Sequence, residues 1–114
     1  MLKHVRIFLD PKSREEMEPI CMDAALNEQQ KIGGKWFIFG LSGNTDDKST
    51  WYPIVCRIDG TIDFGAGYEG ERWWRTNIRE KTVQVGSSVS VWDERDQEFL
   101  FQVARIQELR ETPS

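Results

Sequence analysis

The sequence predicts an α+β fold, in which one helix packs on a curved, mostly antiparallel sheet of six or seven strands, either open or closed into a small barrel. Three observations predict it. Short β-rich runs recur along the chain, the pair Asp59-Gly60 separates two of them, and residues 13–31 carry apolar side chains at helical spacing. The helix would lie between the first and second strands.

Residues 51–64 predict the hairpin around which the sheet is organised. Its two β-rich runs flank Asp59-Gly60, a pair that suits the two positive-φ positions of a type I′ turn. Alternation puts one set of side chains on a common apolar face, namely Tyr52, Ile54, Cys56, Ile58, Ile62 and Phe64. Pro53 indicates that the first strand has a free edge near that position.

The first strand and the helix are predicted from the N-terminal third of the chain. Residues 2–9 alternate as a half-buried strand that stops at Asp10-Pro11. Ser13 and Glu16 fit a capping box, and the apolar positions at helical spacing are Met17, Ile20, Cys21, Ala24 and Ala25. Pro19 leaves two alternatives: a helix that begins near it, which we favour, or one bent helix from 13 to about 31.

The remaining strands are predicted with less regular patterns. Residues 35–41 are apolar on both faces, which is typical of a central strand that is covered on both sides. Residues 42–50 form a polar loop, and residues 65–70 a glycine-rich connection. Residues 72–79 alternate, so that Trp74, Thr76 and Ile78 share one face, whereas Trp73, Arg75, Asn77 and Arg79 share the other.

The C-terminal third predicts a second hairpin. Residues 82–92 look like one strand with a bulge at Gly86, residues 93–97 like a charged turn, and residues 98–103 like the partner strand. Residues 103–110 lose the period of two and fit either a bulged strand end or a short helix.

Composition and charge limit the class of protein. The 114 residues fit one domain over 1–114, and the net charge of −4 argues against nucleic-acid binding, because such proteins use Lys and Arg to neutralise phosphates. No apolar run is long enough to cross a bilayer, and the N-terminus lacks the apolar core of a signal peptide. We therefore expect a cytoplasmic protein without a membrane partner, whose two cysteines, Cys21 and Cys56, are buried free thiols.

Residues capable of catalysis are sparse. The one histidine, His4, falls on the polar face of the first strand, and Cys56 falls on an apolar face where a thiol is unreactive. One histidine and two unspaced cysteines give no zinc site, and no calcium-loop spacing is present. We expect no metal, no cofactor and no enzyme activity, with one alternative: a glycan-active enzyme that uses Glu69 or Glu71 beside Trp73 and Trp74.

The leading hypothesis is a non-catalytic protein-binding module, most concretely a small acidic inhibitor or immunity-type protein that blocks a basic toxin or nucleic-acid enzyme. Its binding residues would come from two acidic loops and the arginine-tryptophan strand: Asp46, Asp47, Trp73, Arg75, Asp93, Glu94 and Asp96. A second alternative is a small-ligand-binding barrel lined by Trp36, Trp51, Trp73 and Trp74. A homodimer could use the hairpin edge, which Pro53 would weaken.

Overall fold

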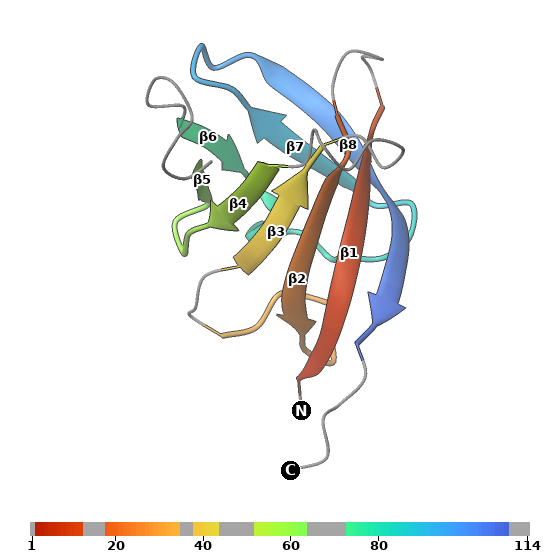
Figure 1. Ribbon diagram of the computed structural model, residues 1–114. Helices are drawn as coiled ribbons and strands as arrows, with labels where there is room; N and C mark the ends of the chain where they lie inside the picture. The colour runs from red at the N-terminus through yellow and green to blue at the C-terminus, as the bar shows by residue number, and fades with distance from the viewer. Residues whose placement is uncertain (1, 13–17, 35–37, 44–51, 64–72, 110–114) are drawn as a thin grey trace.

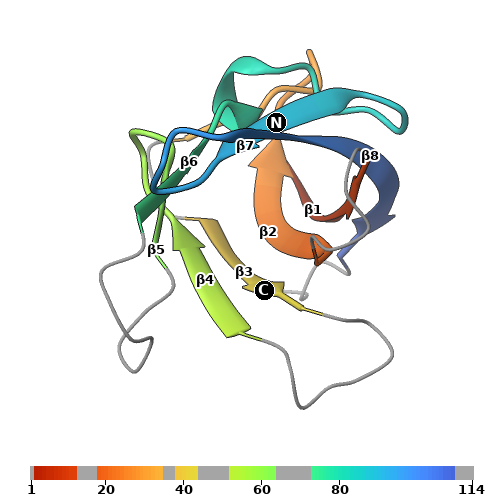
Figure 2. The ribbon, with the colours of Figure 1, turned by 90° about the horizontal axis from the view of Figure 1, so that it is seen from above.

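The chain forms a closed antiparallel β-barrel in which every strand pairs with its sequence neighbours and the last pairs with the first (Figure 1). The computed structural model describes residues 2–12, 18–34, 38–43, 52–63 and 73–109. Within them lie eight strands: β1 (Lys3–Pro11), β2 (Ile20–Leu26), β3 (Ile38–Ser42), β4 (Tyr52–Cys56), β5 (Thr61–Asp63), β6 (Trp73–Thr76), β7 (Ser88–Trp92) and β8 (Glu98–Glu108). Seen from above, the strands surround a single interior (Figure 2).

The small barrel is confirmed, but the α+β class and the predicted helix are wrong. Residues 20–26 form β2, which pairs with β1 from Lys3↔Leu26 to Leu9↔Ile20. The described helical structure is one 3₁₀ turn, η2 (Ile78–Glu80). None of the described helical structure has the length and apolarity needed to cross a membrane.

β2 resembled a helix because apolar residues lie on both of its faces. Ile20, Met22, Ala24 and Leu26 point into the barrel with a period of two. Cys21 and Ala25, on the outer face, are buried as well, so the alternation that marks a half-exposed strand is hidden. Pro19 directly precedes the strand, where it removes no ladder hydrogen bond. The proposed capping box at 13–16 lies outside the described residues.

The hairpin at 51–64 is confirmed, although its turn differs from the prediction. β4 and β5 pair at Val55↔Asp63 and Cys56↔Ile62, and Ile54, Cys56 and Ile62 are buried inside the barrel. Gly60 has a positive φ of 91°, but Asp59 does not, so the turn is not type I′. Ile58 is exposed in the turn rather than aligned with the strand face.

β3 corrects the prediction of a strand covered on both faces. Ile38 is buried inside the barrel, but Phe39 and Leu41, on the outer face, are 62% and 42% exposed. Cross-strand register places Phe39 beside Val55 and Leu41 beside Pro53 on β4. Hydrophobic side chains on this strand therefore serve both the core and an exposed outer surface.

The segment between β6 and β7 also differs from the predicted bulged strand. Residues 84–87 form a turn in which the Ser87 N–H donates to the Gln84 carbonyl, and Gly86 has a φ of 95°. Ile78 and Val83 of this segment are fully buried against the barrel core, and the Val83 N–H donates to the Gln30 carbonyl at 2.7 Å. The segment thus closes one end of the barrel.

β8 decides between the two alternatives for 103–110, because it continues as a strand to Glu108 and pairs with both β7 and β1. A register shift between Phe8 and Leu9 accommodates the irregularity. The lost alternation in the sequence marks this irregular pairing rather than a helix. The two cysteines are free and buried, as expected.

Candidate functional site

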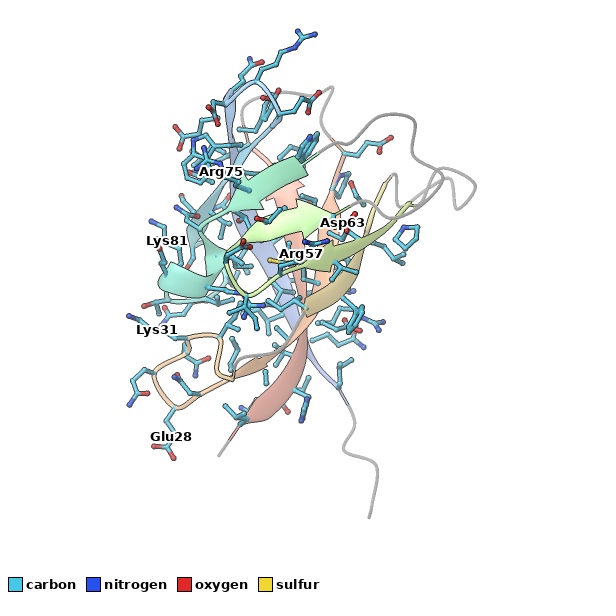
Figure 3. The ribbon with its side chains drawn as sticks, turned by 90° about the vertical axis from the view of Figure 1, so that its left-hand side faces the viewer. Glu28, Lys31, Arg57, Asp63, Arg75 and Lys81 are labelled. Atoms are coloured by element: carbon cyan, nitrogen blue, oxygen red, sulfur yellow. The ribbon has the colours of Figure 1, made fainter. Side chains whose placement is uncertain are left out.

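The acidic turn at 93–97 lies beside β6, and this neighbourhood gathers most of the predicted binding residues. β7 and β8 form the hairpin that carries the turn, and β6 pairs with β7 through Arg75↔Trp92 and Thr76↔Val91. Arg75 and Trp92 therefore lie side by side on the outer face, next to the turn (Figure 3 labels Arg75). Sequence-distant residues thus come together because the strands follow one another as a meander.

Two side-chain contacts attach the turn to β6. Arg75 Nη2 donates to Asp96 Oδ1 at 2.8 Å, and Trp74 Nε1 donates to Glu94 Oε2 at 2.8 Å. The Arg75 guanidinium also lies over the Trp92 ring, 5.2 Å from its centroid. The Arg75–Asp96 ion pair is exposed, at 57% and 79% of the two side chains, so it adds little stability.

The turn is also held by its own hydrogen bonds. Asp93 Oδ1 accepts from the backbone N–H groups of Arg95 and Gln97, both at 2.9 Å. The Asp96 N–H donates to the Asp93 carbonyl at 3.0 Å, and Asp96 adopts a φ of 60°. Aspartate suits both positions, because its short carboxylate accepts local N–H groups and tolerates a left-handed backbone.

The same arrangement recurs at residues 27–31. Asn27 Oδ1 accepts from the N–H groups of Gln29 and Lys31, and Gln30 has a φ of 62°. An Asx residue that opens a turn and a left-handed residue three positions later are thus a repeated solution in this fold. The two turns differ in the charge of their first residue, because Asp93 is a carboxylate whereas Asn27 is a neutral amide.

We call the surface formed by Trp74, Arg75, Trp92, Asp93, Glu94 and Asp96 the acidic turn patch. Trp74 joins the patch to the core, because its ring stacks on Phe99 with centroids 6.5 Å apart while its Nε1 reaches Glu94. The patch has carboxylates that can accept hydrogen bonds or pair with cations, and an arginine stacked on an aromatic ring. Such groups recognise charged, planar or basic surfaces.

The charge near this end of the barrel is predominantly acidic among the described residues. β1, β3, β5 and β7 all end here, by the antiparallel order of the strands. The acidic residues of this end are Asp10, Glu18, Asp63, Asp93, Glu94, Asp96 and Glu98, and its basic residues are Lys12, Arg75, Arg95 and Arg57, whose side chain pairs with Asp63 at 2.9 Å. A field of this sign attracts cationic groups.

The structure brings together four of the seven predicted binding residues: Arg75, Asp93, Glu94 and Asp96. Asp46 and Asp47 lie outside the described residues. For Trp73 only the backbone is described, and it pairs with Asp63 on β5. The sequence interpretation did not assign Trp92 to the site, although its position just before the charged turn and the β6–β7 pairing were signals that could have found it.

The other candidate chemistry gains no geometry from the described residues. His4 is exposed on β1, and no group of three or more His, Cys, Asp or Glu side chains among the described residues could hold a metal ion. Burial raises the pKa of the Cys56 thiol, and the nearby Arg79 opposes that shift. Glu69, Glu71, Trp36 and Trp51 lie outside the described residues.

Comparison with known proteins identifies no protein that is similar to this chain. No protein-family model matches the chain, and neither a curated protein nor a solved structure is significantly similar to it.

Proposed function

We propose that the chain is a non-catalytic protein-binding module, most concretely a small acidic inhibitor or immunity-type protein, and that the acidic turn patch contacts a basic partner. The observation that carries the proposal is the way in which the turn is held. Asp93 fixes the backbone, while Arg75 and Trp74 fix Asp96 and Glu94, yet these charged groups remain at the surface.

A turn held in one conformation has an advantage in binding. Association costs free energy for every loop and side chain that must be ordered, about 0.5–1.5 kcal/mol for each flexible side chain. Because the Glu94 side chain accepts a hydrogen bond from Trp74 on β6, less of that cost remains to be met when a partner docks. The hydrogen bonds of Asp93 to Arg95 and Gln97 contribute in the same way.

The composition of the patch supports a protein partner. Trp92 and Arg75 are stacked at 5.2 Å, and tryptophan and arginine are the residues most enriched in binding hot spots. The surrounding carboxylates of Asp10 and Glu98 extend the acidic field beyond the patch and would speed the approach of a basic surface. The free thiols support a reducing, cytoplasmic setting as part of the same proposal.

The test compares two variants that lose the same amount of negative charge at opposite ends of the barrel. The patch variant carries Asp93→Asn, Glu94→Gln and Asp96→Asn, which keep oxygen acceptors for Arg95, Gln97, Trp74 and Arg75. The control carries Asp59→Asn, Glu80→Gln and Glu108→Gln, all exposed and at the end of the barrel where β4, β6 and β8 end. Tagged wild type and both variants are used to capture partners from the native host.

The proposal expects wild type and control to retain the same basic protein and the patch variant to lose it. Equal capture by all three proteins, or capture of no basic protein by wild type, would contradict the proposal. Because the side-chain shapes are preserved, a loss in the patch variant reports the charges rather than an altered turn.

A second candidate function is a small-ligand-binding barrel, and the position of Trp74 favours it. This side chain is half-buried, packs on the core and stacks on Phe99 close to the acidic end. Eight-stranded barrels are wide enough to be filled by side chains or to hold one small ligand. Titration of a metabolite and sugar panel against intrinsic fluorescence tests it: a ligand must shift the emission of wild type but not of Trp74→Phe.

A further inference from the structure

The outer surface of β2–β4 carries an apolar stripe, on the part of the barrel away from β6–β8. It consists of Cys21 on β2, Phe39 and Leu41 on β3, and Pro53 and Val55 on β4. Register makes it continuous, because Cys21↔Leu41↔Pro53 form one cross-strand row and Phe39↔Val55 belong to the next. We call these five residues the β3 stripe.

Phe39, Leu41 and Pro53 of the β3 stripe are exposed to a degree that the core does not require, whereas Cys21 at its β2 edge is buried. Phe39 and Leu41 are 62% and 42% exposed, and they are two of the four large hydrophobic side chains that are exposed among the described residues. Phe8 on β1 is the register partner of Cys21. Its ring is covered by Arg105, whose guanidinium lies 4.1 Å from the ring centroid. Phe39 and Leu41 keep their outer surfaces exposed, and contiguous exposed apolar surface marks an interaction site.

The charged residues beside the β3 stripe indicate which kind of partner would bind there. On the β2 side Asp23 is paired with Arg6, with Nε–Oδ1 at 2.7 Å and Nη2–Oδ2 at 3.0 Å. On the β4 side Arg57 is paired with Asp63 at 2.9 Å, and Figure 3 shows these two side chains together on the outer face. Each side therefore carries one positive and one negative charge, so this surface is neutral although the whole chain is acidic.

A second copy of the chain matches this arrangement. If a two-fold axis runs along β3, β2 of one copy faces β4 of the other, because the operation exchanges the two sides of the stripe. Asp23 shares its row with Phe39 and Val55, and Arg57 lies two residues beyond Val55 on the same face. The axis thus places Asp23 over the partner's Val55 and next to its Arg57 along β4, twice over, while Phe39 and Leu41 of the two copies meet at the axis.

We propose that two copies of this chain associate through the β3 stripe, with β3 of each copy at the two-fold axis and Asp23 of each copy over Val55 and beside Arg57 of the other. The sheets pack face to face, with aligned strands. The surface of a curved barrel limits the contact to about three strands from each copy, so the dimer belongs to the weak class of interfaces. This proposal does not depend on the acidic turn patch, which stays free in the dimer.

Sedimentation equilibrium over a concentration series that reaches the millimolar range tests the proposal. Wild type is expected to self-associate, and Phe39→Asp to weaken the association at least about tenfold, because each dimer then buries two unpaired charges. Val85→Asp is the matched control, since Val85 is 66% exposed but lies outside the β3 stripe. It is expected to behave as wild type.

A cysteine cross-link tests the position of the axis. Leu41→Cys is made together with Cys21→Ala, because Cys21 is the register partner of Leu41 and would otherwise compete. Mild oxidation should link two copies through position 41, whereas Val85→Cys in the same background should not link. Wild type that stays monomeric throughout, equal weakening by Phe39→Asp and Val85→Asp, or equal cross-linking at positions 41 and 85 would each overturn the proposal.

Discussion

At the residue scale, Gly40 shows how closely β2 and β3 approach. A Cβ added at this position would overlap the carbonyl oxygen of Cys21 and lie 3.1 Å from the Cα of Met22. Both are backbone atoms, which cannot move aside without displacing β2. Gly86 is a different case, because its φ of 95° disfavours a side chain while the nearest atom to an added Cβ is 4.0 Å away.

These two glycines predict different losses of stability. Gly40→Ala should lower the free energy of unfolding by about 2–3 kcal/mol, because the strands must separate. Gly86→Ala should lower it by about 1 kcal/mol, the cost of a left-handed backbone alone. Urea denaturation measures both, and a smaller loss for Gly40→Ala than for Gly86→Ala would contradict the close approach.

The two thiols make a prediction about pH. Burial raises the pKa of Cys21 and of Cys56 above the ordinary value of 9.0. Since the folded pKa is the higher one, the stability from the neutral thiols is complete below pH 9.0 and is lost as the pH rises above it. The urea midpoint should therefore fall between pH 8 and pH 10, and should fall less in Cys56→Ala.

The labelling of the thiols provides an independent check. A thiol-specific reagent at neutral pH should modify neither cysteine rapidly until urea unfolds the chain, because both side chains are buried. Rapid labelling of Cys56 in the folded protein, or identical pH dependence in wild type and Cys56→Ala, would be incompatible with this account.

At the scale of elements, the segment 77–87 acts as the closure of one barrel end. Val83 is fully buried and Val85, two residues later, is 66% exposed. The same substitution at the two sites therefore separates the effect of burial on stability from the effect of the residue type. Val83→Ala should lower the free energy of unfolding by about 2 kcal/mol. Val85→Ala should change it by less than about 0.5 kcal/mol. Similar losses at both sites would show that the segment does not pack on the core.

The elements also show what the sequence could and could not predict. Strand β1, the hairpin at β4–β5 and the charged turn were predictable, because alternation and turn residues are local signals. The helix expected to begin near Pro19 was wrong, because Cys21 and Ala25 are buried on the outer face of a strand, a tertiary effect that imitates helical spacing. Phe39 and Leu41 caused the opposite error, because these hydrophobic side chains were expected to be covered and are exposed.

The candidate site was predictable in part for a similar reason. The acidic turn could be recognised from its composition, and its proximity to Arg75 followed from the assumption of a meander. The stacking of Arg75 on Trp92 and the bond from Trp74 to Glu94 depend on exact register, which periodicity alone does not fix.

At the scale of the whole molecule, the closed barrel separates two surfaces. The acidic turn patch lies on β6 and on the β7–β8 turn, whereas the β3 stripe lies on β2–β4. Closure pairs β8 with β1, so the described strands form a barrel without a terminal strand. The edge expected near Pro53 stays a prediction, because the residues that follow β5 lie outside the described part of the chain. Partner binding and self-association can therefore be disrupted separately, each by its own variant.

The central claim is that exposed charge on a fixed turn recognises a basic partner. Its most direct measurement is the affinity of the captured partner for wild type, for Asp93→Asn/Glu94→Gln/Asp96→Asn and for the far-end control, at low and at moderate salt. We predict that the patch variant binds at least about tenfold more weakly at low salt and loses most of the salt dependence, while the control matches wild type. Equal affinities for the three proteins at low salt would contradict the claim.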